Sequence, residues 1–180
     1  MKVFGIGLNK TGTKTLGACF TTLGYRNKSF DLDLLKCFAV GDYDTVFKVS
    51  DTFDSFEDWP WPLLYREFDH RYPDAKFILT VRRDPETWYA SLCKHADLTG
   101  PTEARKIAYG YEMPYQAKEH HISRYLKHNS EVMEYFKEKP GKLLVVSWEK
   151  GDGWAEICNF LGVHPLPGVP FPHKNSSLDR

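Results

Sequence analysis

The chain has 180 residues, a length that suits one domain with a sizeable hydrophobic core. Its 24 basic residues balance its 24 acidic residues, so no overall field directs it to nucleic acid or to an anionic membrane. Aromatic residues make up 15% of the sequence and no apolar run approaches the ~20 residues of a membrane span, which excludes a disordered chain and a membrane-spanning one. We therefore expect a single globular domain over 1–180 in which any anion site is local.

Short apolar runs alternate with longer stretches of helical periodicity, the pattern of a parallel sheet wrapped by helices. The predicted strands are 2–7, 53–57, 76–81 and 143–147. The predicted helices are 13–23, 31–40, 42–51, 60–72, 85–95 and 154–161, together with 111–139, which fits one long helix or a broken pair. The prolines at 165, 167, 170 and 172 predict irregular structure toward the C-terminus. These elements predict a three-layer α/β/α domain with a mainly parallel sheet.

The sequence carries no targeting or metal-binding pattern. The stretch from Met1 to Gly5 reads as a strand rather than a secretory leader, so we expect a cytoplasmic protein. Four cysteines are scattered without a Cys-x-x-Cys pair, which argues against a disulfide framework. His120 and His121 point to different faces of a predicted helix that also carries His128, so we expect solvated histidines rather than a metal site.

The stretch between the first predicted strand and the helix after it has the residues of an anion site. It reads Gly5-Ile6-Gly7-Leu8-Asn9-Lys10-Thr11-Gly12-Thr13-Lys14-Thr15. A glycine-bearing turn at a helix N-terminus directs backbone N–H groups and the positive end of the helix dipole at an anion. Lys10 and Lys14 add full charges, and the threonines add hydroxyl donors. Gly7 and Gly12 have the separation found in a nucleoside triphosphate P-loop, but Thr13 stands where that motif has its lysine.

Two segments resemble the donor-binding motifs of sulfotransferases. The run Lys10-Thr11-Gly12-Thr13 is similar to their loop for the 5′-phosphosulfate of 3′-phosphoadenosine 5′-phosphosulfate (PAPS), and Lys14 and Thr15 continue it. Arg83 follows the predicted strand 76–81, and Ser91 comes eight positions later, the spacing with which sulfotransferases hold the 3′-phosphate of the donor. Two helical turns separate Arg83 from Ser91, so both can reach one phosphate.

Further similar stretches extend the resemblance over nearly the whole chain. They are 53–61, 88–89, 154–162 and 170–175. Two features depart from the family pattern. Lys14 occupies a position where a hydroxyl residue is common, and the chain is short, which removes loops that would otherwise define an acceptor pocket.

The resemblance implies a PAPS-dependent sulfotransferase with a fold like that of P-loop nucleoside triphosphate hydrolases. Such an enzyme moves a sulfuryl group to a hydroxyl or amine of a small-molecule or glycan acceptor, without a metal, and releases 3′-phosphoadenosine 5′-phosphate (PAP). Lys10 is expected to stabilise the leaving group. Asp58 is the first candidate for the general base, although a role as the cap of the Trp59–Pro60 turn stays open, and His95 is the second. Lys174 is expected to fold over the nucleotide.

Two other functions use the same anion loop. A small P-loop kinase would use a triphosphate, but the displaced lysine and the arginine after the third predicted strand count against it. A non-catalytic binder of sulfated or phosphorylated ligands would need the loop but no base. In every case we expect no nucleic-acid or membrane partner, and a second copy of the chain is a candidate to complete the acceptor pocket as a homodimer.

Overall fold

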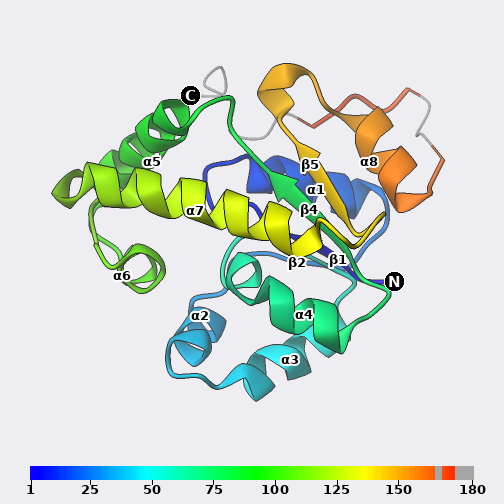
Figure 1. Cartoon of the computed structure of the whole chain (residues 1–180), viewed down its shortest axis with the longest axis horizontal. Helices are drawn as coiled ribbons and strands as arrows, with labels where there is room; N and C mark the ends of the chain where they lie inside the picture. The colour runs from blue at the N-terminus through cyan, green and yellow to red at the C-terminus, as the bar shows by residue number, and fades with distance from the viewer. Residues whose placement is uncertain (165–167, 173–180) are drawn as a thin grey trace.

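The computed structural model of the protein describes residues 1–164 and 168–172. Within these residues, five parallel strands form one sheet in the order β2-β3-β1-β4-β5 (Figure 1). The strands are β1 (Val3–Gly5), β2 (Asn27–Lys28), β3 (Ser55–Phe56), β4 (Lys76–Thr80) and β5 (Leu143–Val146). Val3 of β1 lies opposite Ser55 of β3 and Lys76 of β4. The first strand is therefore interior, which places the loop after it at the middle of the sheet.

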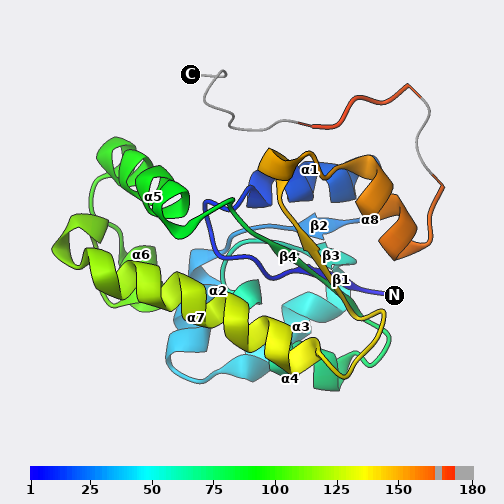
Figure 2. The same cartoon turned by 45° about the horizontal axis from the view of Figure 1, so that its top comes forward.

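Helices cover both faces of the sheet, which confirms the three-layer α/β/α fold (Figure 2). One face carries α1 (Thr13–Thr22) and α8 (Trp154–Leu161). The other carries α2 (Leu32–Ala39), α3 (Tyr43–Thr52), α4 (Tyr65–Arg71) and α7 (Lys118–Phe136). The helices α5 (Pro85–Thr99) and α6 (Glu103–Tyr109) lie on the side toward which the strands run (Figure 1). Three short 3₁₀ turns cover Trp61–Leu64, Pro114–Gln116 and Trp148–Lys150.

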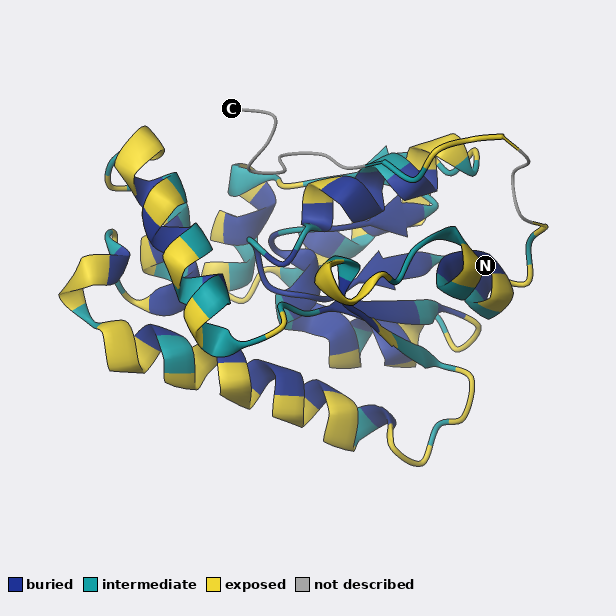
Figure 3. Cartoon of the chain, turned by 90° about the horizontal axis from the view of Figure 1, so that it is seen from above, coloured by how far each residue is buried: buried dark blue, intermediate teal, exposed yellow. Residues whose placement is uncertain are grey.

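The side chains of the strands alternate between two hydrophobic cores, as the period of a buried strand requires. Val3 and Ile78 pack against α1 and α8. Phe4 points to the opposite face, where its ring stacks on Phe56 at 4.5 Å and on Phe68 of α4 at 4.4 Å between centroids. Figure 3 shows the same division, with buried strands inside and helices that are exposed along their outer sides. The two cores fix the sheet, and with it the direction of the loops that leave it.

Several predicted boundaries are wrong. The first strand ends at Gly5 instead of residue 7, and the second strand is reduced to Ser55–Phe56, because α3 extends to Thr52 and the two residues between them only connect the elements. The long helix begins at Lys118 rather than at 111, after the 3₁₀ turn Pro114–Gln116. The segment 42–51 is helical as predicted, and Asp42 caps it by accepting a hydrogen bond from the Thr45 N–H group at 3.2 Å.

Two elements were missing from the prediction. The edge strand β2 contains only Asn27 and Lys28 and therefore has no apolar alternation. The helix α6 has only 7 residues, too few for a clear periodic pattern, and its N-cap is Thr102, whose hydroxyl accepts from the Arg105 N–H group at 3.3 Å.

The expectation of solvated histidines is wrong for two of the three residues. His121 and His128 are buried on the inner face of α7, and only His120 is exposed. None of the helices in the part of the chain that the structure describes is long and apolar enough to cross a membrane. Lys174 lies outside the described residues.

Candidate functional site

The loop between β1 and α1 has the backbone of an anion site. Lys10 has a φ of 68° and Gly12 a φ of 95°, so two residues within three positions adopt the left-handed conformation. The helix α1 starts directly after Gly12, and no described side chain caps it there. The N–H groups of its first turn and the positive end of its dipole are therefore directed at the loop.

Side chains from other elements hold this loop from inside. The Thr11 hydroxyl donates to the Leu8 carbonyl and contacts the Thr80 hydroxyl at the end of β4, each at 2.6 Å. The indole N–H of Trp88, on α5, donates to the Asn9 carbonyl at 2.9 Å. Thr11 is buried, so in this arrangement its hydroxyl supports the loop rather than facing out of it.

Three more anchors come from residues that the sequence analysis did not identify as part of the site. His128 of α7 contacts the Ile6 carbonyl through Nε2 at 2.7 Å, and burial lowers its pKa to about 4, so the neutral ring donates this hydrogen bond. The Trp148 indole N–H donates to the Gly12 carbonyl at 3.2 Å. The Tyr109 hydroxyl, on α6, donates to the side-chain carbonyl of Asn9. The helices α6 and α7 and the 3₁₀ turn Trp148–Lys150 thus hold the loop in place.

The two loop glycines are required by close packing. A methyl group at Gly7 would lie 2.1 Å from the Thr80 hydroxyl oxygen, and one at Gly12 would lie 2.3 Å from the Trp148 ring. Both distances are too short for any side chain. These contacts explain the glycine spacing that the sequence shares with nucleoside triphosphate P-loops.

Lys10, Thr13, Lys14 and Asp58 come together where α1 begins. The Thr13 hydroxyl donates to Asp58 Oδ2 at 3.4 Å, and the Trp59 N–H group donates to Asp58 Oδ1 at 2.9 Å. Burial raises the pKa of the Asp58 carboxyl, and the nearby charges of Lys14 and Lys10 act in the opposite direction. One oxygen of Asp58 is therefore held by the turn after β3, and the other contacts the anion loop.

Glu57 is an acidic residue of this region that the sequence analysis missed. It follows β3 directly and is only 2% exposed. Burial, together with the adjacent charge of Asp58, raises its pKa to about 7. The sequence contained a signal for Glu57, because Glu57 and Asp58 are adjacent acidic residues at the end of a predicted strand.

Arg83 and Ser91 lie on either side of the start of α5. Arg83 is exposed, and its Nε donates to Asp84 Oδ2 at 3.1 Å and to the Thr87 hydroxyl at 3.0 Å. Ser91 is half-buried and comes one turn after Thr87 on the same face of α5. His95 follows one turn further, about 15 Å along the helix from Pro85. His95 therefore lies one turn further from the strand end than Ser91.

Thr15 is buried in the first turn of α1. Among the described residues, no group of three His, Cys, Asp or Glu side chains could hold a metal ion.

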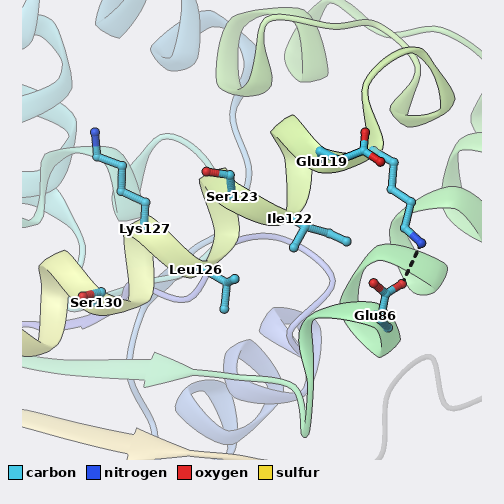
Figure 4. Close-up of a pocket in the computed structure, with 8 residues that line it drawn as sticks. Glu86, Glu119, Ile122, Ser123, Leu126, Lys127 and Ser130 are labelled. Atoms are coloured by element: carbon cyan, nitrogen blue, oxygen red, sulfur yellow. Dashed lines mark ion pairs between the residues drawn. The ribbon is translucent and has the colours of Figure 1, made fainter.

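A surface groove of about 670 Å³ lies elsewhere, between α7 and the start of α5 (Figure 4). Ile122 and Leu126 line it from α7, and Lys118 forms an ion pair with Glu86 at 2.9 Å. The groove shares no lining residue with the loop between β1 and α1, so it is separate from the candidate site.

Comparison with known proteins connects this arrangement to one family. The chain is 26% identical over 213 residues to "Ava biosynthesis cluster protein M" of Aspergillus versicolor, a match that covers 96% of this chain and 80% of that protein. The crystal structure of a sulfotransferase from Alicyclobacillus acidocaldarius superposes with a TM-score of 0.59 at 17% identity, over 95% of this chain and 86% of the other, which shows a shared fold. A model of the sulfotransferase domain matches residues 2–179. The chain therefore belongs to the sulfotransferase domain family.

Proposed function

We propose that the protein transfers a sulfuryl group from PAPS to a hydroxyl or amine of an acceptor. The observation that carries this proposal is the meeting of Lys10, Thr13 and Lys14 with Asp58 at the N-terminus of α1. Two ammonium groups and a set of helix N–H donors suit the phosphosulfate, and a nearby carboxylate suits the proton of an acceptor. Family membership supports the class of reaction.

The residues of the chain divide the work between donor and acceptor. PAPS, when bound, supplies the sulfuryl group and leaves as PAP. Lys10 and Lys14 stabilise the negative charge that grows on the leaving phosphate oxygen. Thr13 and the first N–H groups of α1 hold the phosphosulfate, while Arg83 and Ser91 hold the 3′-phosphate. The anchored loop supplies these groups in a fixed geometry, which is where we expect most of the rate acceleration to originate.

Asp58 is the proposed base on the acceptor side. Its carboxylate removes the proton of the attacking hydroxyl or amine, and burial makes it a stronger base by raising its pKa. Its contact with the Thr13 hydroxyl fixes one of its oxygens beside the loop. His95 stays the second candidate, and its greater distance along α5 makes it the weaker one.

Ligand-dependent stabilisation tests the choice of donor. Thermal unfolding is followed with PAP, with ATP plus Mg²⁺, and without ligand. PAP at 100 times its Kd should add about 2.7 kcal/mol to the free energy of unfolding, whereas stabilisation by ATP alone would support a kinase instead.

Transfer itself is tested in reverse, so that no acceptor has to be known. The protein is mixed with PAP and 4-nitrophenyl sulfate, which yields PAPS and 4-nitrophenolate, and the release of the phenolate is followed by its absorbance. Binding of PAP without any transfer here, or from PAPS to a panel of alcohols and amines, would identify a non-catalytic binder.

A further inference from the structure

Glu57 is a buried carboxyl group that the proposed mechanism does not use. It is 2% exposed, and its Oε1 lies 3.4 Å from the Asn27 side-chain nitrogen, a long hydrogen bond. No described side chain donates a well-formed hydrogen bond to its Oε2. A buried carboxylate with so little hydrogen bonding is costly, so its protonation state must respond to the charges around it.

The helix α1 approaches this carboxyl closely. A methyl group at Gly17 would lie 2.7 Å from Oε1, so the glycine permits the contact. Lys14 comes three residues before Gly17 and therefore lies on the same side of α1. The charge of Lys14 acts on both Glu57 and Asp58, which follow the carboxyl end of β3.

The groups that face Glu57 come from four segments. Asp58 follows it in the chain, Lys14 faces it from α1, Asn27 from β2, and Ser29 from the segment after β2. Burial, and after it the charge of Asp58, raise the pKa of Glu57, while Ser29, Lys14 and Asn27 lower it, and the net value is about 7. Lys14 is therefore the one full positive charge among these named neighbours, and it also belongs to the anion loop.

We propose that Glu57 is a positioning residue that takes up a proton when a phosphate anion occupies the loop. Without an anion, the pair Glu57–Asp58 attracts the Lys14 ammonium group. A bound phosphate draws that ammonium group to itself, and Glu57 then accepts a proton from the buffer, so that its carboxylate becomes a neutral carboxylic acid and no other bond changes. The acid pair thus loses one negative charge as the anionic donor binds. This inference rests on the proposed function, because it requires the donor's phosphate in the loop.

Proton uptake can be measured directly by isothermal titration calorimetry of PAP binding at pH 8. Titrations in two buffers with different ionisation enthalpies give the number of protons taken up. Phosphate monoesters with a second pKa near 6 are already fully ionised at this pH, so uptake reports on protein groups. For the wild-type protein we expect an uptake on the order of several tenths of a proton per PAP bound.

Three variants identify the group that is protonated. Glu57→Gln should abolish the uptake and change Kd only a few-fold, because the neutral side chain mimics the protonated acid. Lys14→Thr, at an exposed position, should also reduce the uptake, because the ammonium group no longer moves between the two anions. Asp58→Asn should retain uptake but displace it to lower pH, since the negative charge that raises the pKa of Glu57 is gone.

The outcomes separate this inference from the proposed function. PAP binding without proton uptake by the wild-type protein would overturn the role of Glu57 and leave the donor assignment standing. The role of Glu57 would also be overturned if Glu57→Gln took up as many protons per PAP as the wild-type protein. If the glutamine variant does not fold, the same result for Lys14→Thr would overturn it. Failure of PAP to bind the wild-type protein would overturn both proposals.

Discussion

Replacing Glu57 by Gln should change how stability depends on pH. A folded-state pKa of about 7, against an ordinary value of 4.5, means that the folded protein holds this proton where the unfolded chain has lost it. The contribution of Glu57 to the free energy of unfolding is therefore greatest below about pH 4.5. It falls by about 3 kcal/mol as the pH rises to about 7. The glutamine variant has no such decline. Relative to the wild-type protein, it should gain about 2.5 kcal/mol between pH 5 and pH 8.

His128 contributes with the opposite sign, which makes the comparison between variants necessary. Its folded-state pKa of about 4, below the ordinary 6.5, gives stability that is present above pH 6.5 and is lost as the pH falls toward 4. Between about pH 4.5 and 6.5 the two groups nearly cancel in the wild-type protein. The variant should therefore show a rising stability in this range, where the wild-type curve is flatter.

Urea unfolding followed by circular dichroism at half-unit steps from pH 4.5 to 8 measures this difference. Glu138→Gln is a matched control, because Glu138 is exposed and its charge is solvated in both states. Parallel stability curves for the wild-type protein and Glu57→Gln would refute the reasoning, since they would mean that Glu57 titrates alike in the folded and unfolded chains.

Three further predictions concern the loop and the donor. Arg83→Ala should weaken PAP binding by roughly 30-fold but leave adenosine 5′-phosphate binding nearly unchanged in calorimetry; an equal loss for both would contradict the 3′-phosphate assignment. Lys10→Met should impair reverse transfer from 4-nitrophenyl sulfate far more than Asp58→Asn, while the asparagine variant should lose ~100-fold with an alcohol acceptor; equal impairment in the reverse assay would remove Asp58 from the role of base. Gly12→Ala should cost roughly 1 to 3 kcal/mol in urea unfolding, because of its positive φ and the Trp148 ring, and an unchanged midpoint would count against the close packing.

The sequence was sufficient for the parts of the fold that follow from local periodicity. The strands after Lys76 and Leu143 are runs of consecutive apolar residues, and the amphipathic helix after Gly12 follows a turn rich in glycine and threonine. These patterns predicted the parallel sheet and the loop between its first strand and the helix that follows. The anion loop was found because glycine spacing and charge are both local properties of the chain.

The anchors of the loop could not be predicted in the same way. His128 and Trp148 reach Ile6 and Gly12 from more than 100 residues away in the chain. A single histidine or tryptophan on a helix carries no local signal that tells which carbonyl it will contact. The burial of Glu57 was missed for the same reason, because it depends on how closely α1 packs on the end of β3.

The unusual lysine of the loop has a physical explanation in this packing. The resemblance to sulfotransferases implies a hydroxyl residue at the position of Lys14, and an extra positive charge beside Lys10 would by itself repel it. Two carboxyl groups, Glu57 and Asp58, lie under the same turn of α1 and offset that charge. A buried acid pair of this kind is unfavourable without a nearby cation. The lysine and the acid pair therefore stabilise each other, and we expect a hydroxyl residue at position 14 to be best tolerated when Glu57 is neutral. We therefore expect Glu57→Gln to raise the free energy of unfolding at pH 8 more in the Lys14→Thr background than in the wild-type background. Urea unfolding of the wild-type protein, the two single variants and the double variant measures both differences. Equal differences would show that the two side chains do not interact.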